Sequence, residues 1–412
     1  MKKIGFLIVY LFFSLILLSN VWAKASEYDY FNLENLNLDV KTNHLLLYNL
    51  KDEKVVYQKG YEDKISIASL TKIMTAMVAI ENNEDLDKIV TIPKEAFYNT
   101  NGYAMAGFKM NEKVTIRDLL YGTLLPSGVE AAQALAVLTG GNLDNFVVLM
   151  NELKDKIGMN ATHFSNPVGR DDENNYSTLE DLKKLILYAL QNEVFETIYT
   201  TRYYKTTNYL ELYSTLVGPS EKYHLNVGSI KGSKSGFTKD AGLCLSSLYE
   251  FDNVEYLLIL AGSMYQNGFP NHIVDSLEIY NYFNEHYDYI NVLEKDRVLA
   301  HLKVQDATLE DYFIKSSEDV SFYLEKEIKD FSYQYEGIEV LNRKIKQNDF
   351  LGKVKVFYKE NLLYSYDVYL NREIKYNYTD YKIMGIVLVF LIICLFSICK
   401  LKKRKRKKRR KI

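Results

Sequence analysis

A serine and a lysine three residues apart are the first candidates for chemistry in this chain. Ser69 and Lys72 lie in the stretch 67–76, and this spacing places both side chains on one face of a helix. Residues 73–80 are mostly apolar, so we expect a buried helix. Burial lowers the pKa of a lysine, and Ser69 would then be a nucleophile beside its base. The alternative is a capping serine followed by a lysine whose amine reaches solvent.

Two later stretches complete a set of motifs. Ser127-Gly128-Val129 and Lys234-Ser235-Gly236 follow the S-x-x-K stretch in the chain. Penicillin-binding proteins and class A β-lactamases carry S-x-x-K, S-D-N and K-T-G in that order. Together with segments 162–169, 171–178 and 241–244, these motifs resemble the D-alanyl-D-alanine carboxypeptidases, the low-molecular-weight penicillin-binding proteins. The resemblance covers residues 30 to 370.

The resemblance implies a serine-type carboxypeptidase that removes the terminal D-alanine from peptidoglycan stem peptides. Ser69 would attack the bond between two terminal D-alanines and form an acyl-enzyme that water then hydrolyses. Lys72 would be the general base, and Ser127 would pass a proton to the leaving amine. β-Lactam antibiotics would be covalent inhibitors. The reaction needs no cofactor, and the six histidines show no metal-ligand spacing, so we expect no metal site.

Lys234, Ser235, Gly236 and Phe237 are the expected substrate-binding residues. The family usually has Thr at position 235, and Ser235 keeps the hydroxyl that can bind a substrate carboxylate. Lys234 would supply positive charge for the anionic peptide terminus, and Gly236 would let the substrate approach the backbone. The resemblance assigns the oxyanion-binding amides to Ser69 and Phe237.

The second motif departs from the family, because Val129 stands where Asn is usual. A valine cannot hydrogen-bond a substrate amide or orient a lysine. Two alternatives to an active carboxypeptidase stay open, and Val129 motivates the first of them. One is a weakened or inactive cell-wall-binding membrane protein of the same fold. The presence of all four motif residues, Ser69, Lys72, Ser127 and Lys234, argues against it. The other is a β-lactamase; the anchored β-rich domain and the absence of an evident deacylating glutamate loop argue against it.

The two ends of the chain carry targeting signals. Residues 1–25 combine a basic start, an apolar run and the small-residue site Ala23-Lys24-Ala25, a pattern typical of a cleaved signal peptide. Residues 383–399 are uncharged, and at about 1.5 Å per residue they suffice for a short transmembrane helix. The basic tail 400–412 follows, and the positive-inside rule places it in the cytoplasm. We expect a single-pass bacterial membrane protein with an extracytoplasmic catalytic body.

Charge is distributed unevenly along the chain. The formal net charge is −2, but residues 400–411 hold eleven of the 51 Lys and Arg residues and no acid. Residues 1–25 hold three more, which leaves 37 basic residues against all 53 acidic residues, a net charge of −16 for the body. Such an acidic body is not expected to bind nucleic acid.

Hydrophobic patterns and the resemblance together predict the fold class. Strand patterns lie near both ends of the predicted catalytic domain, and helical spacing lies between them. With the resemblance, this indicates an α/β (α+β) penicillin-binding/β-lactamase-like domain over 26–290, with a central antiparallel sheet of five strands flanked by helices. Short alternating segments then predict a small β-rich domain over 291–375. The expected strands are 43–50, 55–58, 242–248 and 254–261, and the expected helices are 114–125, 130–138, 146–157, 178–190 and 275–287.

Overall fold

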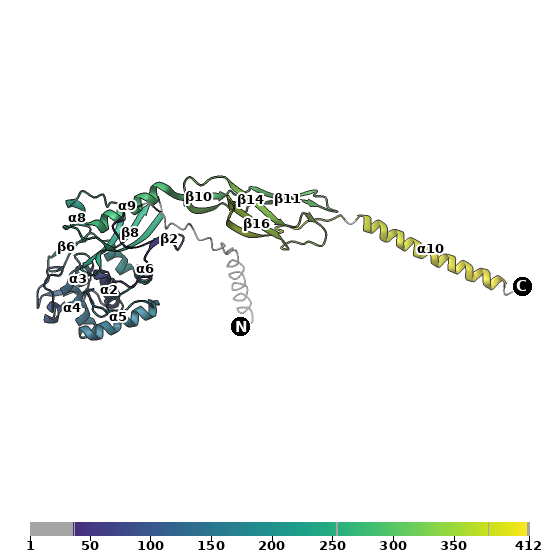
Figure 1. Ribbon diagram of the computed structural model, residues 1–412. Coiled ribbons are helices and arrows are strands. Elements are labelled where there is room, and N and C mark those ends of the chain that lie inside the picture. The colour runs from purple at the N-terminus through teal and green to yellow at the C-terminus, as the bar shows by residue number, and fades with distance from the viewer. Residues whose placement is uncertain (1–35, 37, 253, 378, 410–412) are drawn as a thin grey trace, which may run out of the picture. The chain divides into compact units, whose positions relative to one another are not determined.

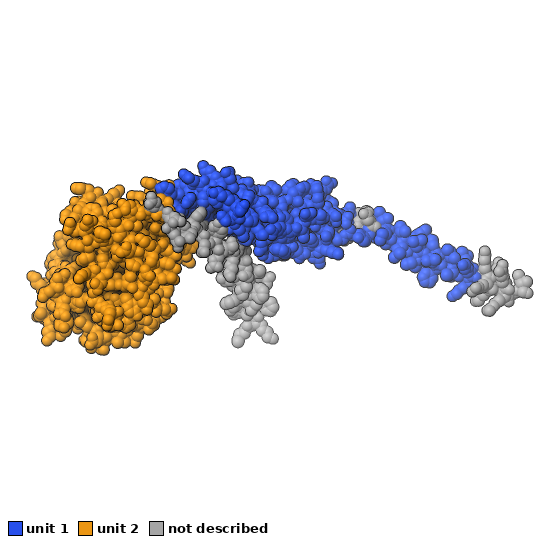
Figure 2. All heavy atoms as spheres, in the orientation of Figure 1, with its two compact units in different colours: residues 1–29, 286–412 blue, residues 30–285 orange. Residues whose placement is uncertain are grey.

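The computed structural model describes residues 36, 38–252, 254–377 and 379–409 (Figure 1). The predicted signal peptide, residues 1–25, lies outside the described residues, and so do the last three residues of the tail. The chain divides into two compact units, whose described parts are residues 36–285 and 286–409 (Figure 2). This division falls close to the predicted limit between residues 290 and 291.

A five-stranded antiparallel sheet forms the centre of the first unit, in the order β2-β1-β9-β8-β7. It confirms the predicted central sheet and the α/β (α+β) fold class. The first two strands and the last three meet because β1 pairs with β9. β7 is at the sheet edge, and it carries the Lys234-Ser235-Gly236 motif. The strands are β1 (His44–Asn49), β2 (Lys54–Lys59), β7 (Ile230–Thr238), β8 (Gly242–Phe251) and β9 (Val254–Ser263).

The remaining elements of this unit are mostly helices that lie between β2 and β7 in the chain. Several begin where a side chain caps the first turn: Thr115 makes a capping box with Asp118, and Thr178 accepts from the Asp181 amide. The helices are α2 (Thr71–Glu81), α3 (Ile116–Leu124), α4 (Val129–Gly140), α5 (Leu143–Ile157), α6 (Leu179–Leu190), α7 (Glu193–Tyr199), α8 (Val217–Lys222) and α9 (Asn271–His286). The unit also contains two 3-10 turns, η2 (Ala68–Leu70) and η3 (Lys94–Phe97). It contains two further strand pairs, β3 (Ile89–Thr91) with β4 (Lys113–Thr115) and β5 (Tyr203–Lys205) with β6 (Glu211–Tyr213).

Helix α5 starts at Leu143 instead of the expected residue 146, and two other predicted boundaries are corrected as well. The helix expected over 114–125 starts only at Ile116, because residues 113–115 pair with β3 and Thr115 then caps α3. The helix expected from residue 275 starts at Asn271. All three corrections concern where an element begins, which depends on contacts that local spacing does not contain.

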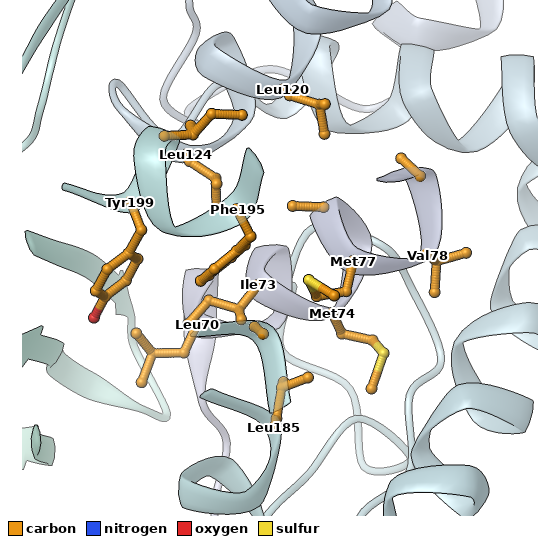
Figure 3. Close-up of a cluster of buried hydrophobic side chains, with 14 of the residues drawn as sticks. Leu70, Ile73, Met74, Met77, Val78, Leu120, Leu124, Leu185, Phe195 and Tyr199 are labelled. Atoms are coloured by element: carbon orange, nitrogen blue, oxygen red, sulfur yellow. The ribbon is translucent and has the colours of Figure 1, made fainter. Parts of the chain in front are cut away.

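The buried helix α2 anchors the first unit. Every residue from Thr71 to Ile80 is buried, which confirms the predicted core helix. Burying each large apolar side chain of this kind contributes about 1.5–3 kcal/mol. The helix is thereby held firmly at the centre of the unit, with the 3-10 turn η2 at its N-terminus. Its side chains pack with those of three other helices, as Figure 3 shows for Ile73, Met74, Met77, Val78, Leu120, Leu124, Leu185, Phe195 and Tyr199.

The second unit is rich in strands, and its described part ends in a long helix. Its sheets have the orders β10-β13, β12-β11-β15 and β14-β16-β17. Leu302, Leu341, Leu351 and Val354 belong to the apolar core of this unit. The strands are β10 (Tyr287–Leu293), β11 (Val298–Val304), β12 (Asp311–Lys315), β13 (Val320–Glu325), β14 (Phe331–Gly337), β15 (Val340–Leu341), β16 (Phe350–Tyr358) and β17 (Asn361–Tyr369).

Helix α10 (Thr379–Arg409) contains the predicted transmembrane segment. Its stretch Tyr381–Lys403 is long and apolar enough to cross a membrane, and its most apolar 18 residues have a mean hydropathy of 2.8. The uncharged run 383–399 lies within it.

Candidate active site

Ser69 lies in the tight turn η2 directly before α2, and two glycines enclose this turn. Ala68 has φ of +46°, in the left-handed region that few residues other than glycine adopt. A Cβ atom on Gly169 would lie 1.8 Å from the Ala68 carbonyl oxygen, and one on Gly236 would lie 2.7 Å from the Ser69 nitrogen. The loop that carries Gly169 and the strand that carries Gly236 therefore pack directly against the backbone of the nucleophile turn.

Lys72 is buried on the first turn of α2, beside Ser69. Its Nζ lies 2.8 Å from the Ser69 Oγ and donates to the Val168 carbonyl at 3.1 Å. Only 1% of the residue is exposed. The pKa of Lys72 is lowered to about 7, chiefly by burial and also by the charge of Arg170, whereas the charge of Glu130 opposes the shift. A large fraction of the amine is therefore uncharged at neutral pH, as a base requires.

The loop 164–170 holds the Val168 carbonyl in place. A single acceptor, Oδ1 of Asn166, receives the backbone N–H groups of Val168 at 3.3 Å, Gly169 at 2.8 Å and Arg170 at 3.0 Å. These bonds fix the turn that presents the Val168 carbonyl to Lys72. Asn166 lies in the segment 162–169 that carries part of the family resemblance, and its link to Lys72 through Val168 is visible only in three dimensions.

A second lysine–serine pair faces the same site. Nζ of Lys234 donates to the Ser127 Oγ at 2.8 Å and to the Ser235 carbonyl at 2.6 Å. Lys234 is fully buried, and burial together with the positive charge of Lys72 holds the pKa of Lys234 well below its usual value. Ser127 has φ of +64° and is 5% exposed. The second and third motifs are thus joined by a direct hydrogen bond.

Ser235 and Phe237 extend the site along the edge strand β7. Ser235 Oγ donates to Thr215 Oγ1 at 2.7 Å, and the Thr215 amide donates to the Leu125 carbonyl at 3.0 Å. Phe237 is 46% exposed, and its ring lies 4.5 Å from that of Tyr265. Sequence reasoning missed Thr215, because it belongs to no motif and reaches Ser235 only through the fold.

Val129 and Glu130 do not fill the role of the usual Asn. Val129 is 1% exposed and packs with Ala132 and Val168. Oε1 of Glu130 accepts three backbone N–H groups from residues 106–108, at 2.7–3.3 Å. Glu130 therefore holds the backbone of residues 106–108 in place and makes no hydrogen bond with Lys72. Burial raises the pKa of Glu130. Its Oε2 is buried without a hydrogen-bond partner among the described residues.

The structure brings the sequence-predicted residues Ser69, Lys72, Ser127, Lys234, Ser235 and Gly236 to one site, with Phe237 next to it on β7. Cys244 is fully buried, and burial raises the pKa of its thiol to about 12, as an inert cysteine would show. Among the described residues, no group of His, Cys, Asp and Glu could hold a metal ion. The arrangement suits nucleophilic acyl transfer, with an uncharged amine beside a serine hydroxyl.

The sequence of this chain matches a known protein family and known relatives. The profile of the D-alanyl-D-alanine carboxypeptidase family matches residues 32–260, more than half of the chain. A D-alanyl-D-alanine carboxypeptidase from Streptomyces sp. strain K15 is 33% identical over 213 residues, which are 44% of this chain and 73% of the relative.

Two solved structures share the fold of this chain. The crystal structure of the Streptomyces K15 DD-transpeptidase is 29% identical, with a TM-score of 0.52 over 59% of this chain and 97% of that chain. The carboxypeptidase DacD from Francisella tularensis, at 20% identity, shares the fold, with a TM-score of 0.61 over 83% of this chain and 95% of that chain. On the family match and the sequence relatives, this chain is a serine peptidase that belongs to the D-alanyl-D-alanine carboxypeptidase family.

Proposed function

We propose that this chain removes the terminal D-alanine from peptidoglycan stem peptides through an acyl-enzyme on Ser69. The observation that carries the proposal is the buried amine of Lys72, which lies 2.8 Å from the Ser69 Oγ with a pKa lowered to about 7. Such an amine can take the hydroxyl proton without first losing one of its own.

Acylation begins when uncharged Lys72 accepts the proton of Ser69. The freed Oγ attacks the carbonyl carbon of the penultimate D-alanine, and the carbonyl oxygen becomes negatively charged. The backbone amides of Ser69 and Phe237, which the family resemblance assigns to this role, would stabilise that charge. Gly236 supports this arrangement, because only a residue without a side chain fits so close to the Ser69 nitrogen.

Departure of D-alanine requires a proton on its amine. Ser127 would supply it, and Lys234, which donates to Ser127 at 2.8 Å, links this hydroxyl to the rest of the site. Lys234 and the Ser235 hydroxyl would bind the substrate's terminal carboxylate. The leaving D-alanine takes the proton that Ser69 lost, by way of Lys72 and Ser127, so the step is balanced. A water molecule, deprotonated by Lys72, then hydrolyses the ester and frees the shortened peptide.

The decisive experiment measures products and adducts with the full chain in detergent. A synthetic peptide ending in Lys-D-Ala-D-Ala should release one equivalent of D-alanine per peptide, and benzylpenicillin should add covalently to Ser69. Ser69→Ala should lose both activities. The lifetime of the adduct separates the alternatives, since a β-lactamase would clear it rapidly and an inactive binding protein would never form it.

A second acceptor for the acyl group is worth testing in the same assay. The Streptomyces K15 relative is named a D-alanyl-D-alanine carboxypeptidase, and its crystal structure is titled a DD-transpeptidase. If an added amine such as glycine appears in the product in place of water, the chain is also a transpeptidase. If only the hydrolysed peptide appears, hydrolysis is its reaction.

We also propose that α10 anchors the enzyme with its catalytic unit outside the cytoplasm. Support comes from the apolar stretch Tyr381–Lys403 and from the basic residues that follow it. In this arrangement the first unit, called the catalytic unit below, and the strands of the second unit would both face the cell wall.

A further inference from the structure

The second unit contains a cavity that the proposed reaction does not use. Its volume is about 1010 Å³, and all the residues that line it belong to this unit. It lies between β12 and β17, each of which is the edge strand of its own sheet. A volume of this size matches cavities that hold ligands of several rings.

Aromatic side chains contribute much of the lining. Phe313 on β12 and Tyr369 on β17 are 48% and 51% exposed. Phe313 stacks on His301 and Tyr369 packs edge-to-face with Phe350, so the exposed remainder of each ring is what a ligand could contact. Tyr364 and Tyr366 line the cavity from the same strand as Tyr369, with ring centroids 5.6 Å apart. Rings that remain exposed at a cavity offer flat apolar faces on which a ligand can stack.

A polar group at the cavity also lacks a partner. The hydroxyl of Tyr366 is buried with no hydrogen-bond partner among the described residues. Burial raises the pKa of Tyr366 to about 12, so the hydroxyl keeps its proton. A buried hydroxyl without a partner needs an explanation in a native structure; because this one is closed to water, a ligand hydroxyl would reach it only after a shift of the neighbouring lining.

The charges around the cavity cancel. Lys353 and Asp367 form an ion pair at 3.3 Å, and the Arg372 guanidinium lies over the ring of Tyr312 at 5.3 Å. A polyanion or polycation would meet as much repulsion as attraction here. The lining therefore favours a neutral ligand that is rich in hydroxyl groups. The charged residues of the lining are Asp296, Glu318, Asp367, Lys315, Lys353 and Arg372.

We propose that this cavity binds the neutral amino-sugar backbone of the cell-wall polymer whose stem peptides the catalytic unit trims. Sugar rings present an apolar C–H face that stacks on aromatic rings, and a rim of hydroxyl and amide groups for polar side chains. The choice of polymer rests on the proposed function, whereas the preference for a neutral saccharide rests on the lining itself. A second binding site would keep the enzyme on the polymer between successive cleavages.

The test uses the full chain in detergent and a neutral probe, the β-1,4-linked hexamer of N-acetylglucosamine. Calorimetric titration should show binding by the wild type. Phe313→Ala and Tyr369→Ala should each weaken it roughly three- to tenfold, because each removes one stacking ring. Tyr203→Ala is the matched control, since Tyr203 is similarly exposed, at 46%, but lies in the catalytic unit. The acylation rate of Ser69 by penicillin should be unchanged in all three variants.

Three results would overturn the proposal. Wild type that does not bind the hexamer at millimolar concentration excludes a saccharide site. Equal binding by wild type and the Phe313→Ala/Tyr369→Ala double variant places the sugar elsewhere. An extended peptide could instead add as a strand to the edge of β12 or β17. If the wild type binds a ten-residue peptide of alternating Thr and Lys but not the hexamer, the surface is a strand-addition site and not a saccharide site. Normal penicillin acylation in these experiments would show that the catalytic site is intact, so a failure of sugar binding would not count against the proposed function.

Discussion

At the scale of residues, the site depends on two lysines buried beside two serines. Removing a lysine from water is unfavourable, and here the cost is reduced because the pKa of each amine falls. The same effect produces a base at neutral pH. The burial of Lys72 at the first turn of α2 therefore belongs to the mechanism as much as to the fold.

Gly236→Ala tests how closely β7 approaches the nucleophile. The added Cβ would lie 2.7 Å from the Ser69 nitrogen and 3.0 Å from the Ala68 Cβ, and the turn backbone cannot rotate away. We expect penicillin acylation to fall by a factor on the order of 10², the typical effect of a small displacement of reacting groups. Rates from intact-mass analysis check this.

Gly218→Ala is the control for that variant. Nothing lies within 4 Å of a Cβ at Gly218, so this variant should acylate normally. Normal acylation by Gly236→Ala would show that β7 does not press on the nucleophile turn.

The residues that could be predicted from the sequence are those whose geometry is local. Ser69 and Lys72 are three residues apart at the start of a helical segment, and this spacing alone indicates that their side chains lie close together. Thr215 and the Val168 carbonyl reach the site from distant segments, so no spacing indicates them. Ser127 and Lys234 were matched through the family motifs, and their direct bond came from the structure.

At the scale of elements, the loop 164–170 links a structural side chain to the base. Asn166 gathers three backbone N–H groups, and the turn that results presents the Val168 carbonyl to Lys72. Gly169 also presses on Ala68. The loop therefore contacts both the turn that carries the nucleophile and the base.

Asn166→Ala should disturb the base more than the fold. Loss of the three bonds loosens the loop and lets water reach Lys72, so the pKa of Lys72 rises from about 7 towards its ordinary value. Since only the uncharged amine is active, the pH at which acylation is half-maximal should move upward by about one unit or more. Acylation rates between pH 5 and 10 measure it.

Asn142→Ala provides the comparison, because Asn142 caps α5 through the Asn145 amide and lies outside this loop. It should cost about 1 kcal/mol of stability and leave the pH profile in place. An Asn166→Ala profile with the wild-type midpoint would mean that the loop does not set the charge of Lys72.

Elements were predicted better than their boundaries. Alternation and helical spacing, which short stretches of sequence contain, predict β1, β2, β8 and β9 and the longer helices of the first unit, whereas the short helices α7 and α8 were not predicted. The start of α3 depends on the pairing of β4 with β3, and the short 3-10 turn η2 ahead of α2 depends on packing by Gly169 and Gly236. Tertiary contacts of this kind leave no periodic pattern.

At the scale of the whole molecule, hydrophobic length and charge make α10 a candidate membrane anchor. Tyr381–Lys403 is the candidate span, and the acidic body precedes it. The second unit adds the described cavity between β12 and β17, which the sequence did not reveal, because its lining comes from several strands.

Removal of residues 383–412 should release the enzyme from the membrane. The truncated chain keeps both compact units up to the start of α10, so it should appear in the soluble fraction and acylate with penicillin as the full chain does. Removal of residues 404–412 alone keeps the apolar stretch, and this variant should stay with the membrane. A 383–412 truncation that remains in the membrane pellet after signal cleavage would contradict a single C-terminal anchor.

The central claim is that uncharged Lys72 activates Ser69, and the penicillin acylation rate as a function of pH tests it most directly. For the wild type, the rate should rise with pH through about 7, because deprotonation of Lys72 creates the base. Lys72→Arg should show no such rise and should react roughly 10²–10⁴-fold more slowly, since a guanidinium does not deprotonate in this range. Ser69→Ala should give no adduct at any pH. Near-normal acylation by Lys72→Arg, with the pH dependence retained, would contradict the account and remove Lys72 from the role of base.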